Sequence, residues 1–257
     1  MKVTVSQLPE DKTQFHDCWD NLMQHISMSQ TQLLLLPELI FGDWIAVNKN
    51  VDLDVKRTNL EDHENWMGKV EAIKDAHVVY SKPVISGDKF HNTAFIWHSD
   101  HGHQKLHSKS YFPEEPHFWE GSVYDKEDGS FEVFTIGELK IGVLLCTEMW
   151  FTQHARDYGK AGIDLLLCPR ATGKASTEQW LRLGQTLSVI SGAYCLSSNR
   201  SGVDQYDFQW GGTGWITAPI NGELLGTTSD DQPFLTLDVD LTISKKAKSE
   251  YPLNAIE

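Results

Sequence analysis

Apolar residues recur along this chain with two alternating periods. Residues 3–6 have the two-residue alternation of a strand, and apolar side chains from 15 to 26 then recur every three or four residues, as on one face of a helix. Short apolar runs and helical patterns continue to follow one another. The pattern predicts strands at 3–6, 32–36, 78–80, 83–86, 93–98, 104–109, 131–136, 140–146, 164–168, 194–198, 212–218, 223–226 and 234–239. It predicts helices at 15–26, 54–74, 150–160 and 177–191.

This alternation, mixed with hairpins, predicts an α/β protein with a mixed sheet, or two sheets, covered by helices. At 257 residues the chain is long enough to bury a core of its own, and no linker or repeat divides it. We therefore expect a single domain, residues 1–257. The tail from about residue 241 looks irregular and could pack on a partner subunit.

The net charge indicates which binding partners are unfavourable, and the cysteines indicate the cellular compartment. Asp and Glu exceed Lys and Arg by 14, which argues against nucleic acid or an anionic membrane surface, because both reward clustered cations. No apolar run reaches the roughly 18 residues of a membrane span, and residues 1–5 resemble a strand rather than a signal peptide. The four cysteines form no C-x-x-C pair, so we expect free thiols in a cytoplasmic protein. Three of them lie in apolar segments and are expected in the core: Cys18, Cys168 and Cys195.

Common motifs of cofactor and metal proteins are absent. No G-x-G-x-x-G follows a strand, no G-x-S-x-G or H-E-x-x-H occurs, and the fragment 172–175 lacks the residues that complete a phosphate loop. Four histidines flank an expected hairpin tip without a typical zinc spacing: His98, His101, His103 and His107. The sequence therefore predicts neither a cofactor nor a metal, and leaves a small molecule as the expected partner.

Three expected strands end in, or directly before, side chains that can do chemistry. One run ends at the thiol of Cys146, the leucines before Pro37 are followed by Glu38, and residues 104–109 end in Lys109. If these strands are neighbours, their ends converge and the three groups meet in one pocket. A thiol is mostly protonated at neutral pH, so a nucleophilic cysteine needs a base or a cation beside it. The carboxylate and the ammonium group would supply both.

The order of these residues resembles the carbon–nitrogen hydrolase (nitrilase) superfamily. Pro-Glu after a leucine run, a strand-end lysine near position 110, and Gly-Val-x-x-Cys-x-Glu with an aromatic residue shortly after occur in that family's order. The resemblance covers nearly the whole chain. Further fragments are similar to the family: 109–121, 155–169, 199–202 and 212–222.

The resemblance implies a four-layer α-β-β-α sandwich, a homodimer or higher homo-oligomer, and a catalytic triad. In that triad Glu38 is the general base and Cys146 attacks an amide or nitrile carbon. Lys109 and the backbone N–H of Thr147 stabilise the oxyanion. A second acid in this family often follows the lysine, and the run Pro-Glu-Glu-Pro favours Glu115 for that role, with Glu114 as the alternative.

The residues around the cysteine leave the substrate open. Many amidases of the family have Asp two residues after the cysteine, where this chain has Glu148, and nitrilases often have Trp-Glu directly after it, where this chain has Thr147. Glu148 is expected to be a hydrogen-bond acceptor behind the site rather than a catalyst. Three aromatic residues could line the substrate pocket, although aromatic side chains are more often core: Trp119, Trp150 and Trp210.

The leading hypothesis is a cofactor-independent hydrolase of small linear amides or N-carbamoyl compounds. Hydrolysis of nitriles by the same triad is the nearest alternative. A non-catalytic protein that binds small molecules with this fold is the alternative from another class. A thiol redox protein is disfavoured because no second cysteine lies near Cys146 in the sequence.

Overall fold

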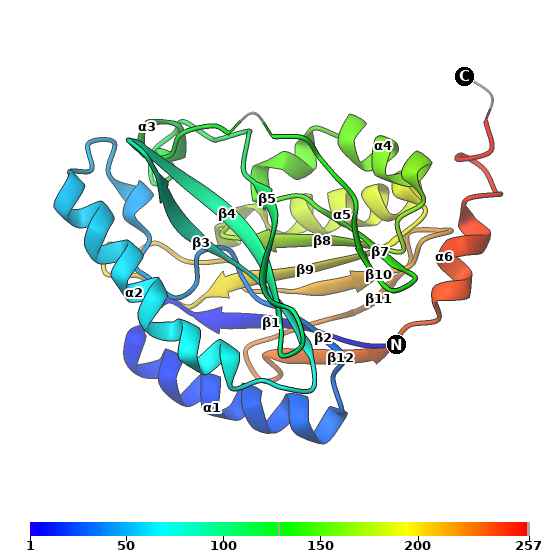
Figure 1. Ribbon diagram of the computed structural model, residues 1–257, viewed down its shortest axis with the longest axis horizontal. Helices are drawn as coiled ribbons and strands as arrows, with labels where there is room; N and C mark the ends of the chain where they lie inside the picture. The colour runs from blue at the N-terminus through cyan, green and yellow to red at the C-terminus, as the bar shows by residue number, and fades with distance from the viewer. Residues whose placement is uncertain (128, 256–257) are drawn as a thin grey trace.

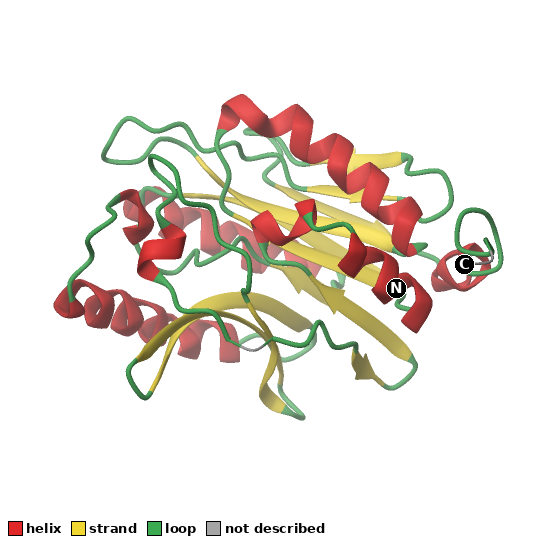
Figure 2. Cartoon of the chain, turned by 90° about the horizontal axis from the view of Figure 1, so that it is seen from above, coloured by secondary structure: helices red, strands yellow, loops and turns green. Residues whose placement is uncertain are grey.

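The computed structural model describes residues 1–127 and 129–255, and shows two β-sheets packed face to face between two layers of helices (Figures 1 and 2). The first sheet contains β1 (Lys2–Pro9), β2 (Leu33–Leu35), β3 (His77–Ser86), β4 (Lys89–His98), β5 (Gly102–Ser108) and β12 (Phe234–Asp238). The second contains β6 (Phe134–Ile136), β7 (Leu139–Val143), β8 (Leu165–Arg170), β9 (Tyr194–Ser201), β10 (Trp215–Thr217) and β11 (Leu224–Thr227).

The helices are α1 (Lys12–Ser29), α2 (Leu53–Glu71), α3 (Glu120–Val123), α4 (Gln153–Ala161), α5 (Thr177–Ser191) and α6 (Leu241–Ala247). Three 3₁₀ turns are η1 (Ile45–Val47), η2 (Cys146–Trp150) and η3 (Lys174–Ser176).

Strand β1 belongs to both sheets. Its first part pairs with β2 in parallel and with β12 antiparallel, and its last residues, 7–9, pair in parallel with β9. The path β5-β4-β3-β2-β1 therefore continues into β9-β8-β7-β6. Strands β2, β1, β9, β8 and β7 are mutually parallel, so their carboxyl ends lie along one edge of the fold.

Three apolar clusters fill the spaces between the four layers. The central cluster lies between the sheets and is rich in β-branched and leucine side chains, including Val5, Leu35, Val143 and Leu167. A second cluster joins the first sheet to α1 and α2 through residues such as Trp19 and Val70. A third joins the second sheet to α4 and α5 through residues such as Tyr158 and Leu187. Buried apolar surface on both faces of each sheet explains why the strands read as continuous apolar runs. The four-layer sandwich expected from the sequence is confirmed.

Some elements differ from the sequence prediction. Residues 146–150 form a 3₁₀ turn, and the helix expected from 150 begins at Gln153. The tail expected to be irregular contains α6, which Asp240 caps by accepting from the Thr242 N–H. Beyond α6, Leu253 packs against the glycines at 159 and 192 of the same chain. That the tail also contacts a partner subunit stays a prediction.

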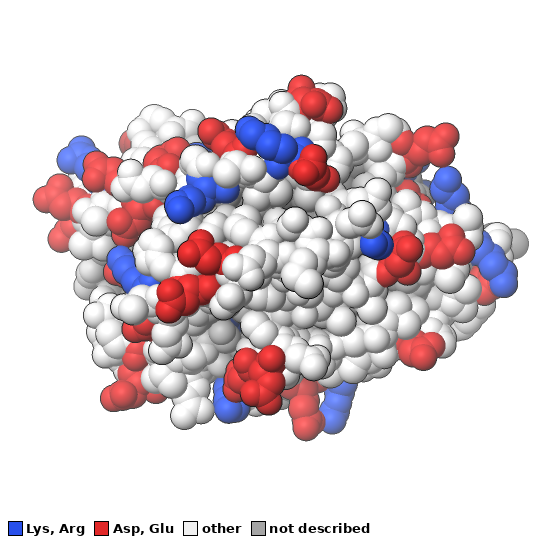
Figure 3. Space-filling model, turned by 90° about the horizontal axis from the view of Figure 1, so that it is seen from below, with Lys and Arg blue, Asp and Glu red and all other residues white. Residues whose placement is uncertain are grey.

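The helices and the surface charge bear on contacts with membranes and nucleic acid. Among the described residues, no helix combines the length and the apolar composition that crossing a membrane requires. On the face drawn in Figure 3, lysine and arginine side chains are scattered among acidic ones and do not gather into a basic patch.

His63 of α2 supports the loop that carries Glu38. Its ring is fully buried and lies so close to Gly42 that a Cβ there would come within 2.6 Å of it. The Nδ1–H donates to the Asn59 carbonyl at 2.7 Å. Burial, with the charge of Arg200 as a smaller cause in the same direction, lowers the pKa of His63 to about 4. The ring is therefore neutral in the folded protein at neutral pH.

This burial predicts a specific loss of stability in acid. An unfolded histidine binds a proton below about pH 6.5, whereas folded His63 does so only near pH 4. Protonation of the unfolded state therefore lowers the free energy of unfolding by about 3 kcal/mol between those pH values. We expect the free energy of unfolding, measured by denaturant titration from pH 7 to 4, to fall less steeply in His63→Gln than in the wild type. The exposed His16→Gln is the control and should keep the wild-type slope. Equal slopes in all three proteins would contradict this account.

Candidate active site

Lys109 follows β5 directly, and two carboxylates enclose its ammonium group. Its Nζ donates to Oε1 of Glu38 at 2.7 Å and to the two oxygens of Glu120 at 2.9 and 2.7 Å. All three side chains are at most 1% exposed. One cation thus lies between two buried acidic side chains, so removal of Lys109 would leave both carboxylates without their cation.

Cys146 lies beside this cluster, at a sharp turn. It is the first residue of η2, three residues after β7 ends, and its φ of +49° lies in the left-handed region that side chains disfavour. A residue held in such a conformation at the end of a strand is typical of a functional turn. The thiol is 3% exposed and donates to the Ala171 carbonyl, with Sγ 3.8 Å from the oxygen.

Burial and the neighbouring charges shift the pKa values of these groups. Burial, and after it the charge of Glu38, raises the pKa of the Cys146 thiol well above its usual range, against the pull of Lys109. Burial works against the Lys109 ammonium, but Glu120 and Glu38 outweigh it and raise the Lys109 pKa. Burial raises the pKa of Glu120, although Lys109 opposes this. The site at rest therefore holds a neutral thiol next to a firmly charged lysine, and the thiol needs a base to become a nucleophile.

Glu38 offers one free carboxylate oxygen for that task. Its Oε1 accepts from Lys109 and, at 2.8 Å, from Nδ2 of Asn92, while Oε2 is buried and has no hydrogen-bond partner in the described structure. The backbone of Glu38 is fixed on both sides: its N–H donates to the Arg170 carbonyl at 3.1 Å, and its carbonyl accepts from Nε of Arg200 at 3.1 Å. The carboxylate is therefore held by its main chain as well as by its side chain.

Glu148 connects the turn of Cys146 to the strand end of Lys109. Its buried carboxylate accepts from the Leu145 N–H at 2.8 Å, from the Ser110 N–H at 2.6 Å and from Nε2 of His107 at 2.8 Å. The first of these donors belongs to the cysteine turn and the other two to the segment that flanks Lys109. Glu148 therefore accepts hydrogen bonds from both segments, and its role as an acceptor behind the site rather than a catalyst stays a prediction.

The second acid beside Lys109 is Glu120, and the expectation of Glu115 is replaced. Glu115 and the alternative, Glu114, are both exposed. The chain reverses at a bridge between Glu115 and Phe118, and the Trp119 N–H donates to the Ala46 carbonyl at 2.8 Å. This reversal returns residue 120 to the lysine, whereas the match of the run Pro-Glu-Glu-Pro to the family favoured Glu115.

The aromatic residues expected to line the pocket lie in different places. Trp119 is partly buried, and its ring has Nζ of Lys49 at 4.8 Å from the centroid. Trp150 is 49% exposed and packs edge-on against Trp180. Trp210 is buried in an aromatic cluster with Trp44, Phe118, His117 and Phe208. Of the three tryptophans, Trp210 is the one that shares an apolar cluster with Ala171, whose carbonyl contacts the thiol.

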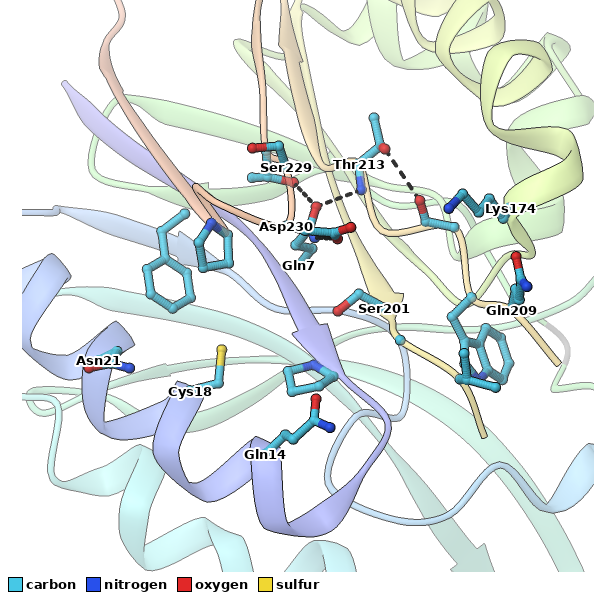
Figure 4. A pocket seen from close by; sticks show the side chains of 18 of the residues that line it. Gln7, Gln14, Cys18, Asn21, Lys174, Ser201, Gln209, Thr213, Ser229 and Asp230 are labelled. Carbon is cyan, nitrogen blue, oxygen red and sulfur yellow. Dashed lines mark hydrogen bonds between the residues drawn. The ribbon is translucent and has the colours of Figure 1, made fainter. Parts of the chain in front are cut away.

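The aromatic cluster joins two loops. Nε1 of Trp44 donates to the His117 carbonyl at 2.8 Å, and Nε2 of His117 lies 2.9 Å from Oδ2 of Asp204. The neighbouring surface groove, with a volume of about 790 Å³, lies between α1 and the ends of β1 and β9 (Figure 4). In Figure 4, Cys18 and Asn21 face Ser201 and Asp230 across it. The described lining includes Trp210 but not Glu38, Lys109, Glu120 or Cys146, so this groove is separate from the thiol.

Sequence reasoning missed two residues of the cluster, Glu120 and Asn92. Glu120 carries no local signal, because its position depends on the reversal of residues 113–121. Asn92 carries a weak signal, since asparagine is depleted in strands and here lies within a strand-like run. The histidines near the β4–β5 turn hold no metal site: in residues 1–127 and 129–255, no three His, Cys, Asp or Glu side chains are arranged to bind a metal ion.

Comparisons with known proteins give the family of this chain and agree with its fold. The family description "Carbon-nitrogen hydrolase" matches residues 2–247. An N-carbamoylputrescine amidase of Arabidopsis thaliana is 22% identical over 90% of this chain and 83% of its own length. Nitrilase homolog 2 of Dictyostelium discoideum is 29% identical over 91% of this chain and 73% of its own length.

Solved structures show the same fold. A carbon-nitrogen hydrolase from Helicobacter pylori superposes with a TM-score of 0.86 at 20% identity, and covers 99% of this chain and 94% of its own. An amidase from Nesterenkonia sp., in complex with acrylamide, superposes with a TM-score of 0.75 at 19% identity, and covers 93% of this chain and 90% of its own. Since the family description spans almost all of the sequence, this chain belongs to the carbon–nitrogen hydrolase family.

The hydrogen bonds that Glu148 accepts predict how its substitution changes stability. An amide has only one acceptor oxygen, so Glu148→Gln would leave at least one buried donor opposite an NH₂ group. We expect the free energy of unfolding to fall by about 3–5 kcal/mol, the range for breaking a buried charged contact. Glu138→Gln is the control, because the Glu138 side chain is 95% exposed, and should change stability by less than about 0.5 kcal/mol. A Glu148→Gln protein as stable as the control would exclude this role.

Proposed function

We propose that this protein hydrolyses the C–N bond of a small amide or N-carbamoyl compound through a thioester on Cys146. The observation that carries the proposal is the buried cluster of Glu38, Lys109 and Glu120 beside a neutral thiol. A cation, a carboxylate with a free oxygen and a thiol in a strained turn are the groups that acyl transfer requires.

In the first half of the reaction, Oε2 of Glu38 takes the thiol proton as Sγ of Cys146 attacks the carbonyl carbon. Lys109 and the Thr147 N–H stabilise the resulting oxyanion. The intermediate collapses with cleavage of the C–N bond, and the proton on Glu38 passes to the departing nitrogen. Ammonia or an amine leaves, and the acyl group remains on sulfur as a thioester.

In the second half, Glu38 removes a proton from water, and the hydroxide attacks the thioester carbon. The C–S bond breaks, the acid product leaves, and the proton on Glu38 returns to the sulfur. Glu120 takes the role that the sequence suggested for Glu115: it orients Lys109 and balances its charge. Glu38 thus moves protons in both halves, and Lys109 keeps its charge throughout.

The relatives support amide hydrolysis over the alternatives. Those named above include an N-carbamoylputrescine amidase, and an omega-amidase of Xenopus laevis is 25% identical over 67% of this chain and 64% of its own length. In another structure of the Nesterenkonia amidase, acrylamide has added to the active-site cysteine. Nitrile hydrolysis by the same residues is the second candidate. The presence of all four charged and nucleophilic groups disfavours a protein that only binds small molecules.

The proposal is tested by ammonia release from matched amides, ureido acids and nitriles of the same chain length. We expect turnover of at least one amide or ureido compound, a loss of about 10³-fold or more in kcat for Cys146→Ala, and a loss of about 10²–10³-fold for Lys109→Met. Cys18→Ser, a change at a cysteine outside the site, is the control and should keep wild-type rates.

Two results would overturn the proposal. Activity confined to nitriles would favour the second candidate. Amide turnover that Cys146→Ala leaves intact would exclude the cysteine mechanism.

A further inference from the structure

Asn92 is in contact with both ends of the Glu38–Lys109 pair. It lies in β4 and is fully buried. Its Nδ2 donates to Oε1 of Glu38 at 2.8 Å, and its main-chain carbonyl accepts from the Lys109 N–H at 2.8 Å. On the neighbouring strand β3, the residue opposite is Pro83, which has no N–H to donate. One asparagine therefore fixes the side chain of the acid and the main chain of the lysine.

The donors on Glu38 are distributed unevenly between its two oxygens. Oε1 accepts from both Asn92 and Lys109, and Oε2 accepts from neither. A carboxylate oxygen that already holds two hydrogen bonds has less affinity for a proton than one that holds none. The proton of the thiol is therefore directed to Oε2.

The second donor also prevents rotation of the carboxylate. The last torsion of a glutamate is soft, so a single contact with Lys109 would let the plane of the carboxylate turn about that contact. With Asn92 in position as well, Oε1 is held from two directions. The free oxygen then stays on the side away from both donors.

A purely structural role explains Asn92 poorly. Asparagine is unfavourable within a strand, and its Oδ1 is buried with no hydrogen-bond partner in the described structure. A buried acceptor without a partner costs stability. A small apolar or hydroxyl side chain would avoid both costs, so the asparagine is explained by what its Nδ2 does for Glu38.

We infer that Asn92 is a positioning residue, which fixes Glu38 so that Oε2 exchanges protons with Cys146. The inference rests on the proposed function for its place in catalysis. Its physical content, the activation of the thiol through Glu38, can be measured without any substrate.

The experiment measures alkylation of Cys146 by iodoacetamide across pH, followed by peptide mass. In the wild type, Glu38 assists loss of the thiol proton. Asn92→Ala should slow alkylation at neutral pH by about tenfold. Asn92→Asp should slow it further and move the rise of the rate to higher pH, because a second carboxylate beside Glu38 disfavours two negative charges. Thr93→Val, which removes a buried hydrogen bond of the same strand to Ser108, is the control and should keep the wild-type profile.

A Glu38→Gln background separates positioning from structure. If Asn92 acts through Glu38, adding Asn92→Ala to Glu38→Gln should change the alkylation rate by less than twofold, since the two effects are not additive. A further tenfold loss in that background, or a wild-type profile in Asn92→Asp, would overturn the inference. If the wild type turns over no amide but alkylation still depends on Asn92, the proposed function fails and the inference stands.

Discussion

The site depends on one buried cation. The Lys109 side chain is fully buried, and its charge is compensated by Glu38 on one side and Glu120 on the other. A lone ammonium group could not be buried there, and two lone carboxylates could not be either. Lys109 therefore makes the burial of both carboxylates possible, and both of them stabilise its charge. This explains why a carboxylate with an unused oxygen can persist beside a thiol in the interior of the protein.

The two-sheet architecture brings these groups together although their strands are not neighbours. Strand β2 leads to Glu38, β5 to Lys109 and β7 to Cys146, and β2 is separated from β5 by β3 and β4. The ends meet because the two sheets face each other and β1 joins them. Hydrogen bonds between the two sheets then fix the positions of these residues. Arg200 on β9 donates to the carbonyl of Glu38, and Glu148 accepts from both the cysteine turn and the segment next to Lys109.

The sequence could predict the strand-end residues but not the residues brought in by tertiary structure. Glu38 and Cys146 follow apolar runs, which buried strands leave in a sequence, and Lys109 ends the expected strand 104–109. Glu120 could not be predicted in the same way, because a reversal of the chain brings it back to the lysine. The short helix α6 was missed because its seven residues have little pattern, and packing, including the hydrogen bond of Ser244 to Asp164, stabilises it.

The central claim is that Cys146 carries the acyl group of the substrate. It is tested most directly by quenching the protein in acid during turnover of a slowly hydrolysed amide and measuring its mass. The account predicts an added mass equal to the acyl group without its amine, located on the Cys146 peptide and absent from Cys146→Ala. Steady turnover with no such adduct, or an adduct that persists in Cys146→Ala, would contradict it.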